Sequence, residues 1–231
     1  MSETKQKDIA AEASDGILEV IRAGEEISLG ENRFYAPATV TAIKIFGLEY
    51  KGHLPDFVGL IDTGGFGEAE YISKILRESN VYPGRVVEVY LTHNHPDHAG
   101  NVHLFPEARV VAPDSIYSLG KPNTFELVDT LFMREPGVEI KGGIPHFSDR
   151  ARIVSTPGHT GQDLSILYQS KSGLIAVVGD LFWSEHDWQH DDEYLSLCVN
   201  PDLQKISRDY VRKLKPAIVI PGHGPAFAPS Y

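Results

Sequence analysis

The sequence predicts an α/β fold, a four-layer αβ/βα sandwich in which two β-sheets pack together with helices outside. Short apolar runs typical of strands recur along the chain and are interrupted by helical patterns. The strand pattern is rebuilt in the second half, and 231 residues is a length for one domain with two pseudo-repeated halves. We therefore predict a disordered N-terminal tail at residues 1–15 and a single domain at residues 16–231. The tail is polar and lacks the apolar segment of a secretory signal.

The first half is expected to form a run of strands that is interrupted by one helix. The strands are expected at residues 17–21, 34–35, 38–46, 57–61 and 86–91. The run 38–46 has the mixed alternation typical of a sheet that is covered on one face. A helix is expected over residues 67–79, because apolar residues recur there at helical spacing: Tyr71, Ile72, Ile75 and Leu76.

The middle of the chain, residues 113–150, gives the weakest pattern. A short helix is expected at residues 114–119 and a strand at 138–140, while residues 124–132 show no clear period. Later strands are expected at residues 152–155, 163–168, 174–178 and 217–220. A final helix is expected over residues 201–214, since Pro201 suits a first helical turn. Its expected core-facing stripe is Leu203, Ile206, Tyr210 and Leu214.

The composition is strongly acidic, with 21 Lys and Arg residues against 32 Asp and Glu residues and a net charge of −11. This balance opposes indiscriminate nucleic-acid binding, which depends on neutralising phosphates, although a local basic patch is compatible with it. The single cysteine, Cys198, excludes an internal disulfide. No run approaches the ~18 apolar residues of a membrane span. We therefore expect a soluble cytoplasmic protein without membrane contact, with the nucleus as a second location and a homodimer as an open alternative.

The segment 91–101 concentrates candidate metal ligands in a few positions. His93, His95, Asp97 and His98 follow an apolar, strand-like run and precede small residues that suit a turn into a helix. Residues two apart in an extended segment point the same way, so His93 and His95 can face one point. Asp97 and His98 lie in the turn and can face a second point nearby. Imidazole and carboxylate groups bind divalent metals, and a merely polar His-rich loop is the alternative.

Three further candidates follow later apolar runs. His159 lies on a Pro-Gly turn, Asp180 ends a run of small and β-branched residues, and His223 follows the last predicted strand. Open α/β sheets place their sites at the carboxyl ends of strands. Because a buried imidazole or carboxylate without a partner is costly, we expect these strand ends to converge on bound metal.

These seven residues resemble the full signature of the metallo-β-lactamase-fold hydrolases, and the resemblance covers residues 16–231. It implies one metal held by His93, His95 and His159, a second held by Asp97, His98 and His223, and Asp180 as the bridge. Many true β-lactamases have Cys at the position of Asp180. The resemblance therefore favours the broader hydrolase branch that includes glyoxalase II.

Two more residues are expected to support these ligands. Asp62 begins an Asp-Thr-Gly-Gly segment, which is also a routine turn sequence. In the resembled family this Asp lies behind the metals and orients a ligand, and a metal-bound His usually donates its other N–H to such a group. The hydroxyl of Thr92 is a second candidate for the same role.

The implied chemistry is hydrolysis. Two divalent ions about 3.5–4 Å apart would share a bridging hydroxide and lower its pKa toward ~7. Asp97 would act as both ligand and base, so Asp97 and Asp180 are the predicted catalytic residues. Zn²⁺ is the expected ion, while a site of His and carboxylate ligands also accepts Fe or Mn.

The substrate is predicted less directly. Residues 156–165 (TPGHTGQDLS) and 221–227 (PGHGPAF) resemble, within the glyoxalase II family, a group of endoribonucleases of histone pre-mRNA 3′-end processing. This resemblance implies an RNA phosphodiester as the substrate. The alternative is a glyoxalase II-like thioesterase or a lactonase that acts on a small acyl substrate.

Charged residues near the C-terminus suggest where RNA would bind. The candidate RNA contacts recur at helical spacing in the final helix: Lys205, Arg208, Arg212 and Lys215. A solvated charged face is the alternative. Residues 184–194 are rich in Asp and His; we expect a solvated acidic loop there, with a third cation site as the alternative. The remaining histidines are given no role: His53, His103 and His146.

Overall fold

A computed structural model of the chain describes residues 11–13, 16–31, 33–46, 54–119, 126–130, 134–140, 150–191 and 194–231. Its larger sheet has eight strands, which are in spatial order β1 (Ala11–Ala13), β2 (Gly16–Arg22), β5 (Val40–Ile45), β6 (Phe57–Ile61), β7 (Val86–Tyr90), β8 (Arg109–Val111), β9 (Ser115–Ser118) and β10 (Glu126–Thr130). The three strands β6, β7 and β8 run parallel to one another, and the other neighbours in this sheet are antiparallel.

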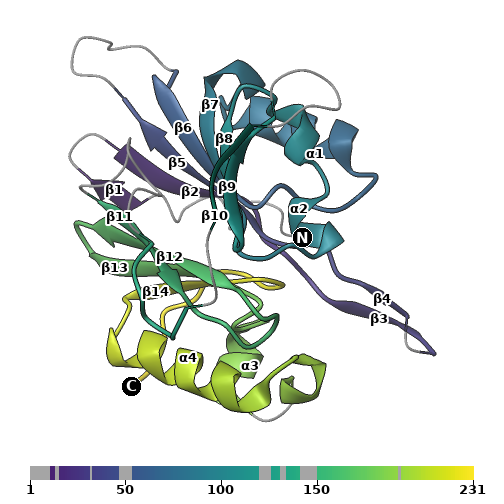
Figure 1. The fold of residues 1–231 in the computed structure, drawn as a ribbon, viewed down its shortest axis with the longest axis vertical. Helices are drawn as coiled ribbons and strands as arrows, with labels where there is room; N and C mark the ends of the chain where they lie inside the picture. Colours follow the sequence, from purple (N-terminus) through teal and green to yellow (C-terminus); the bar gives the residue numbers. More distant parts are fainter. Residues whose placement is uncertain are drawn as a thin grey trace, which may run out of the picture.

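The smaller sheet has the order β11 (Ala151–Ser155), β12 (Leu164–Ser170), β13 (Gly173–Gly179) and β14 (Ile218–Pro221). Its last pair, β13 and β14, is parallel. A separate hairpin of β3 (Ile27–Gly30) and β4 (Arg33–Tyr35) projects away from both sheets (Figure 1). The helices are α1 (Ala69–Glu78), α2 (Pro96–Ala99), α3 (Glu185–Gln189) and α4 (Pro201–Lys213), with 3₁₀ turns at η1 (Pro83–Arg85), η2 (Val102–Leu104) and η3 (Leu195–Leu197).

Three apolar clusters hold four layers together. The central cluster joins the facing sides of both sheets, for example Leu18 and Ile43 with Ile166 and Ile175. A second cluster packs α1 against the outer face of the larger sheet, and a third packs α3 and α4 against the outer face of the smaller one. Figure 1 shows the two helical layers on opposite sides of the molecule. The predicted αβ/βα sandwich is therefore confirmed.

Most predicted strands occur within one or two residues of their expected bounds, but burial differs in β5. We expected the run 38–46 to be covered on one face. Its strand is instead buried at all but the last residue, because the central cluster covers one face and the α1 layer covers the other. This difference follows from the position of β5 inside the sheet, which alternation along the sequence does not reveal.

Two short elements, at residues 11–13 and 115–118, also differ from the predictions. Residues 114–119 were expected to be helical, but Ser115–Ser118 form β9, whose backbone pairs with β8 on one side and β10 on the other. Residues 11–13, expected in the disordered tail, pair with β2 as strand β1. Elements of three to five residues carry too few positions for a periodic signal, so pairing with neighbours decides their structure. No helix among the described residues is long and apolar enough to span a membrane.

The final helix begins as predicted, but its predicted core stripe faces inward only in part. Tyr210 and Leu214 are partly buried and pack against the third cluster. Asn200 caps it by accepting from the backbone N–H of Leu203, and Pro201 occupies its first turn. Ile206, expected in the core, is 56% exposed. The buried positions are instead mostly polar: Gln204, Ser207, Arg208 and Val211. Their polar groups meet backbone carbonyls of neighbouring loops, so polarity here does not mean exposure.

This orientation of α4 can be tested by comparing two truncations. We expect Val211→Ala to lower the free energy of unfolding by about 2 kcal/mol, because it removes buried apolar surface from the third cluster. We expect Ile206→Ala to change it by less than about 0.5 kcal/mol, as is usual for exposed positions. Urea denaturation followed by circular dichroism measures both changes. A larger loss for Ile206→Ala would contradict the orientation described here.

Candidate metal centre

Seven candidate ligands from four strand ends meet where the two sheets approach each other. The loops that carry them leave β7, β11, β13 and β14 at their carboxyl ends. The ligand atoms form two groups whose members lie within 4.8 Å of one another: His93, His95, His159 and Asp180 in one, and Asp97, His98 and His223 in the other. These are the same seven residues, and nearly the same two sets, that the sequence predicts.

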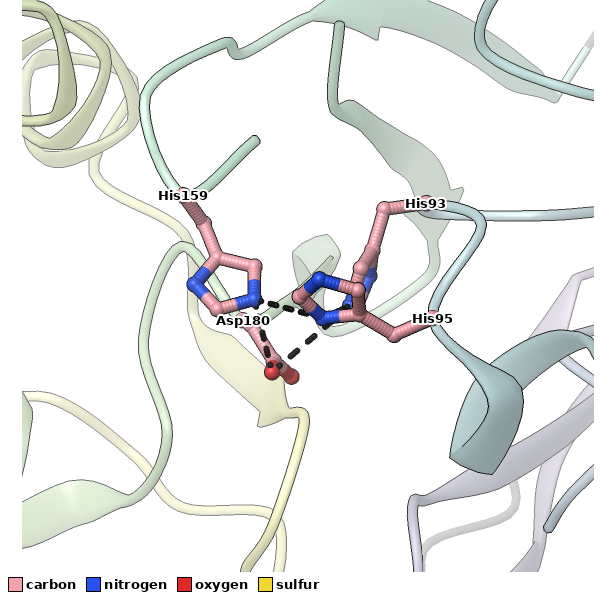
Figure 2. A group of neighbouring side chains, drawn as sticks. All are labelled: His93, His95, His159 and Asp180. Carbon is pink, nitrogen blue, oxygen red and sulfur yellow. Dashed lines mark hydrogen bonds and ion pairs between the residues drawn. The ribbon is translucent and has the colours of Figure 1, made fainter. Parts of the chain in front are cut away.

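The first group brings three imidazole nitrogens around one point (Figure 2). Nδ1 of His95 lies 3.0 Å from Nε2 of His93 and 3.1 Å from Nε2 of His159. One carboxylate oxygen of Asp180, Oδ2, lies 3.3 Å from Nε2 of His159 and 3.7 Å from Nε2 of His93. Burial lowers the pKa of His159 to about 4 and lowers that of His93 well below its usual value. Both rings are therefore neutral near pH 7, which is the form that binds metal.

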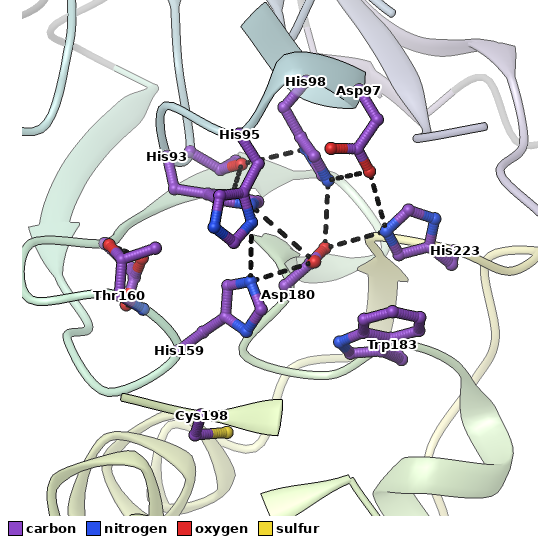
Figure 3. Close-up of polar contacts among 12 residues, drawn as sticks. His93, His95, Asp97, His98, His159, Thr160, Asp180, Trp183, Cys198 and His223 are labelled. Atoms are coloured by element: carbon purple, nitrogen blue, oxygen red, sulfur yellow. Dashed lines mark hydrogen bonds and ion pairs between the residues drawn. The ribbon is translucent and has the colours of Figure 1, made fainter. Parts of the chain in front are cut away.

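The second group faces the other oxygen of the same carboxylate (Figure 3). Oδ1 of Asp180 lies 3.0 Å from Nε2 of His98 and 3.3 Å from Nε2 of His223. Oδ2 of Asp97 lies 3.4 Å from Nε2 of His223 and 3.7 Å from Nε2 of His98. The two oxygens of Asp180 thus point to different groups, as a bridging carboxylate requires.

Two glycines make this close approach feasible. A Cβ at Gly222 would lie 2.1 Å from Oδ1 of Asp180, so a side chain there would displace the carboxylate. Gly179, just before Asp180, has a φ of +52°, and a Cβ there would lie 2.5 Å from Oγ1 of Thr92. The first glycine follows β14 and the second ends β13, so both parallel strands end in residues that leave room for the centre.

The arrangement of polar atoms in the second group suits ligation of a cation better than it suits hydrogen bonds among those atoms. Three buried atoms where this group faces Asp180 form no hydrogen bond of acceptable geometry among the described residues, although the two nitrogens lie 3.0 and 3.3 Å from the oxygen: Nε2 of His98, Nε2 of His223 and Oδ1 of Asp180. Buried polar atoms are nearly always paired, so such a cluster calls for a missing partner. Imidazole and carboxylate donors suit Zn, Fe and Mn ions. The residues present therefore fit the two divalent ions that the sequence analysis expects.

Asp62 and Thr92 lie directly behind these ligands. Oδ2 of Asp62 is 2.7 Å from Nδ1 of His98. The same carboxylate accepts from the backbone N–H and the hydroxyl of Thr92, both at 2.8 Å. Asp62 itself has a φ of +57° at the end of β6, a conformation that aims its side chain across to β7. A contact to Nδ1 leaves Nε2 of His98 to face the centre.

The electrostatics of the centre favour positive charge. Burial acts to lower the pKa of His98, but the carboxylates of Asp180 and Asp62 raise it well above its usual value. Burial acts to raise the pKa of Asp180, but His223, His98 and His93 hold it well below its usual range. A buried carboxylate that stays ionised needs nearby cations, and bound metals can replace the proton on His98 in that role.

The predicted RNA contacts do not form an exposed basic stripe. Arg208 is fully buried and Arg212 is partly buried, and both donate to the carboxylate of Asp191. Arg208 also forms a bidentate ion pair with buried Asp187. Of the predicted contacts only Lys205 and Lys215 are exposed. The predicted stripe is therefore not a continuous exposed basic surface, because the acidic segment beside it pairs with the two arginines. That Lys205 and Lys215 contact RNA stays a prediction.

The acidic segment itself is also not the solvated loop that we expected. Residues 185–189 form α3, which Ser184 caps by accepting from the backbone N–H of Asp187. The Asp187 side chain is fully buried. Neither of the two candidate metal groups found among the described residues includes this segment. His103 is exposed on η2, away from both groups, and His53 and His146 lie outside the described residues.

Two residues near the centre were missed by the sequence analysis. The ring of Trp183 lies 4.5 Å from the ring of His223 and shields that ligand (Figure 3). Asp163 is buried and accepts from the backbone N–H groups of Gly158 and Thr160, at 3.0 and 2.8 Å. It thereby holds the loop that carries His159. The sequence could have indicated both residues, because Trp183 follows Asp180 by three positions and Asp163 follows His159 by four.

An αβ/βα sandwich with a His/Asp centre at its strand ends defines a class of proteins that are usually metal-dependent hydrolases. The sequence model of the metallo-β-lactamase superfamily matches residues 55–223, and the chain belongs to this superfamily. Both the predicted fold and the predicted family are therefore confirmed.

Particular relatives are similar over most of the chain. The Xenopus laevis metallo-β-lactamase domain-containing protein 1 is 32% identical over 212 residues, which cover 90% of this chain and 79% of that protein. A variant of B. thuringiensis AiiA with N-decanoyl-L-homoserine at its active site aligns with a TM-score of 0.57 and 18% identity, over 90% and 92% of the two chains. AidC, a dizinc quorum-quenching lactonase, aligns with a TM-score of 0.57 and 15% identity over 94% of each chain. At these identities, the two structures support the fold alone.

The shared carboxylate leads to a prediction about metal content. We expect the purified protein to bind close to two divalent ions per chain. Asp180→Ala should lose most of both ions, because each of the two groups then loses the carboxylate oxygen that faces it. Elemental analysis after gel filtration measures the ions. His103→Ala is the matched control and should bind as the wild type does. Loss of only one ion in Asp180→Ala would contradict a bridging role.

Proposed function

We propose that the protein is a dinuclear metal-dependent hydrolase of small acyl esters, such as lactones or thioesters. The observation that carries the hydrolase proposal is the division of the Asp180 carboxylate between the two ligand groups. Zn²⁺ is the ion we propose. When bound, two such ions supply an activated water nucleophile and stabilise negative charge that develops on the substrate oxygen.

The residues of the chain have separate roles in this proposal. His93, His95 and His159 form one metal-binding face, and His98 and His223 form most of the other. Asp97 differs from the other ligands, because its side chain is about one-third exposed while Oδ2 still faces His223. It can therefore exchange protons with solvent, and we propose that it takes up the proton released during hydrolysis.

A groove beside His95 supports a substrate without negative charge. Two hollows of about 350 and 330 Å³ share Asn94 and Asp114 as lining residues. The second hollow also reaches His95, Thr160 and Gln162. None of the described lining residues is Lys or Arg, and the charged one is Asp114. Among the described lining residues a phosphodiester chain would meet a carboxylate and neither lysine nor arginine, whereas a neutral acyl group would not be repelled.

Exposed apolar side chains on both sides of the centre support the same substrate class. Phe66 is 86% exposed, and its backbone N–H donates to the carbonyl of Pro96, between His95 and Asp97. Val199 is 75% exposed, and its backbone N–H donates to the carbonyl of His159. Contact with an alkyl chain of the substrate would remove the apolar surface of these side chains from water and so strengthen binding. Two proteins that share this fold are consistent with such a substrate: the AiiA variant holds N-decanoyl-L-homoserine at its active site, and AidC is a dizinc lactonase.

Endoribonuclease activity is the second candidate. What favours it is the resemblance of residues 156–165 and 221–227 to endoribonucleases of histone pre-mRNA 3′-end processing. Arg208 is buried, so of the predicted RNA contacts Lys205 and Lys215 are the exposed ones that this hypothesis can use. If RNA is the substrate, its flanking phosphates need contacts other than Arg208.

A comparison of substrates tests the proposal directly. Zinc-loaded protein should hydrolyse an acyl-homoserine lactone or a thioester, and it should cleave single-stranded RNA much more slowly. Asp97→Ala and Asp180→Asn are the inactive controls for contaminating enzymes. RNA cleavage that depends on both residues, without turnover of any acyl ester, would overturn the proposal in favour of the second candidate.

The exposed apolar residues Phe66 and Val199, called here the apolar rim, lead to a prediction about the acyl-chain length of the substrate. We expect Phe66→Ala to raise the KM for N-decanoyl-homoserine lactone about 10-fold or more, since a buried aromatic contact contributes about 1.5–3 kcal/mol. The KM for the N-butyryl analogue should change less than about 2-fold, because a short chain does not reach the rim. Tyr82→Ala, which removes a partly exposed aromatic ring from the opposite end of β7, is the control. Equal effects on both substrates would contradict this role of Phe66.

A further inference from the structure

Helix α4 contacts both loops that bring ligands from the smaller sheet. The hydroxyl of Ser207 donates to the carbonyl of Pro157, two residues before His159, at 2.6 Å. The amide nitrogen of Gln204 donates to the carbonyls of Asp180 and Leu181, both at 3.1 Å. One helix therefore fixes the backbone of the bridging carboxylate and of a ligand in the first group.

The packing of α4 against the first of these loops leaves no room for adjustment. Gly158, next to His159, has a φ of +146°, and a Cβ there would lie 2.4 Å from the backbone nitrogen of Gln204. The backbone N–H of Asn200, the capping residue of α4, donates to the carbonyl of Gly158. The loop and the helix are thus in backbone contact, so a shift of the helix has to move His159 with it.

The buried guanidinium of Arg208 fixes the second loop. Its Nε donates to the carbonyl of Leu181 at 2.9 Å, and Nη2 pairs with both oxygens of Asp187 at 2.9 and 2.8 Å. Nη1 donates to the carbonyl and the carboxylate of Asp191, both at 2.8 Å. Oδ2 of Asp187 in turn accepts from the backbone N–H of Trp183 at 2.8 Å. The segment between Asp180 and Trp183 is therefore held at both ends.

A buried ion pair of this kind is a poor means of stabilising a fold. Removing a guanidinium and a carboxylate from water costs about as much as their attraction returns, and apolar residues of similar size often do as well. What such a pair provides is a fixed geometry for the groups bound to it. Here those groups are the backbone that carries Asp180 and the backbone that carries Trp183, whose ring packs on His223.

We propose that Gln204 and Arg208 are positioning residues that set the affinity of the centre for metal. They hold the carboxylate of Asp180 between the two groups and hold Trp183 against His223. Neither side chain takes the place of a ligand. This inference rests on the proposed function only in assuming that the centre binds divalent ions.

The first test changes Gln204 alone. Gln204→Met keeps the size of the side chain and removes the amide that donates to the two carbonyls. We expect metal binding, measured by competition with a chromophoric chelator, to weaken about 10–100-fold, as for other residues that orient metal ligands. The thermal unfolding midpoint of the metal-free protein should fall by only a few degrees, because two buried carbonyls lose one donor while the fold is retained. Asp209→Asn, an exposed change on the same helix, is the control and should bind as the wild type does.

The second test separates positioning from stability at the ion pair. Arg208→Met alone leaves Asp187 buried and unpaired, so it should destabilise the protein. The double variant Arg208→Met with Asp187→Leu replaces the pair by apolar groups and should regain thermal stability. We expect its metal affinity to stay at least about 10-fold below that of the wild type. With a substrate in hand, its kcat should fall while its KM is retained.

The outcomes distinguish this inference from the proposed function. A double variant that regains both stability and metal affinity would overturn the positioning role, because the pair would then be needed for folding alone. Wild-type affinity in Gln204→Met would overturn the role of that residue. In both cases the proposed hydrolase would stand. A wild-type protein that binds no divalent ion would overturn the proposed function and this inference with it.

Discussion

The structure depends on keeping one buried carboxylate ionised. Asp180 is 3% exposed, and four histidines from three different loops face its two oxygens. A lone charge in that position would be too costly to keep, so the fold has to surround it with groups that carry or attract positive charge. This requirement explains why loops from both sheets converge on one point. It also explains the glycines at positions 179 and 222, where any side chain would intrude on the carboxylate or on its neighbours.

Each half of the sandwich uses a buried arginine to hold its part of the centre. In the larger sheet, Arg22 donates to the carbonyl of Ala38 and pairs with Glu68, which accepts from the backbone N–H of Gly65 beside the ligand-bearing turn. In the smaller sheet, Arg208 donates to the carbonyl of Leu181 and pairs with Asp187. A planar guanidinium has five donors in fixed directions, so it can fix a loop and satisfy its own charge together. In both halves, therefore, a buried arginine paired with a carboxylate fixes the backbone of a loop beside the centre.

The sequence predicted the ligands better than it predicted their support. His93, Asp180 and their partners could be identified because each follows an apolar strand, and because chemistry leaves few reasons for such residues at strand ends. Arg208 could not, since a cation at helical spacing has the same sequence pattern whether it faces water or a buried carboxylate. The acidic segment that neutralises it lies 17–21 residues earlier in the chain, and only tertiary contacts bring the two together. The same limit applies to Ile206, whose apolar side chain suggested a core position that polar neighbours occupy instead.

The charges around the centre, rather than the metals, decide between the two substrate classes. Two divalent ions can stabilise the charge of one reacting group equally well in an ester or in a phosphodiester. The two substrate classes differ in the groups next to the reacting one. RNA has further phosphates there, whereas an acyl substrate has an alkyl chain or a neutral ring. Phosphates there need lysines or arginines, since affinity for nucleic acid comes mainly from neutralising them. The described side chains along the groove offer Asp114 in that position, and two exposed apolar residues, Phe66 and Val199, are bonded through their backbones to the ligand loops. These side chains support the proposed acyl substrate over a polyanion, whereas the candidate ligands themselves favour neither.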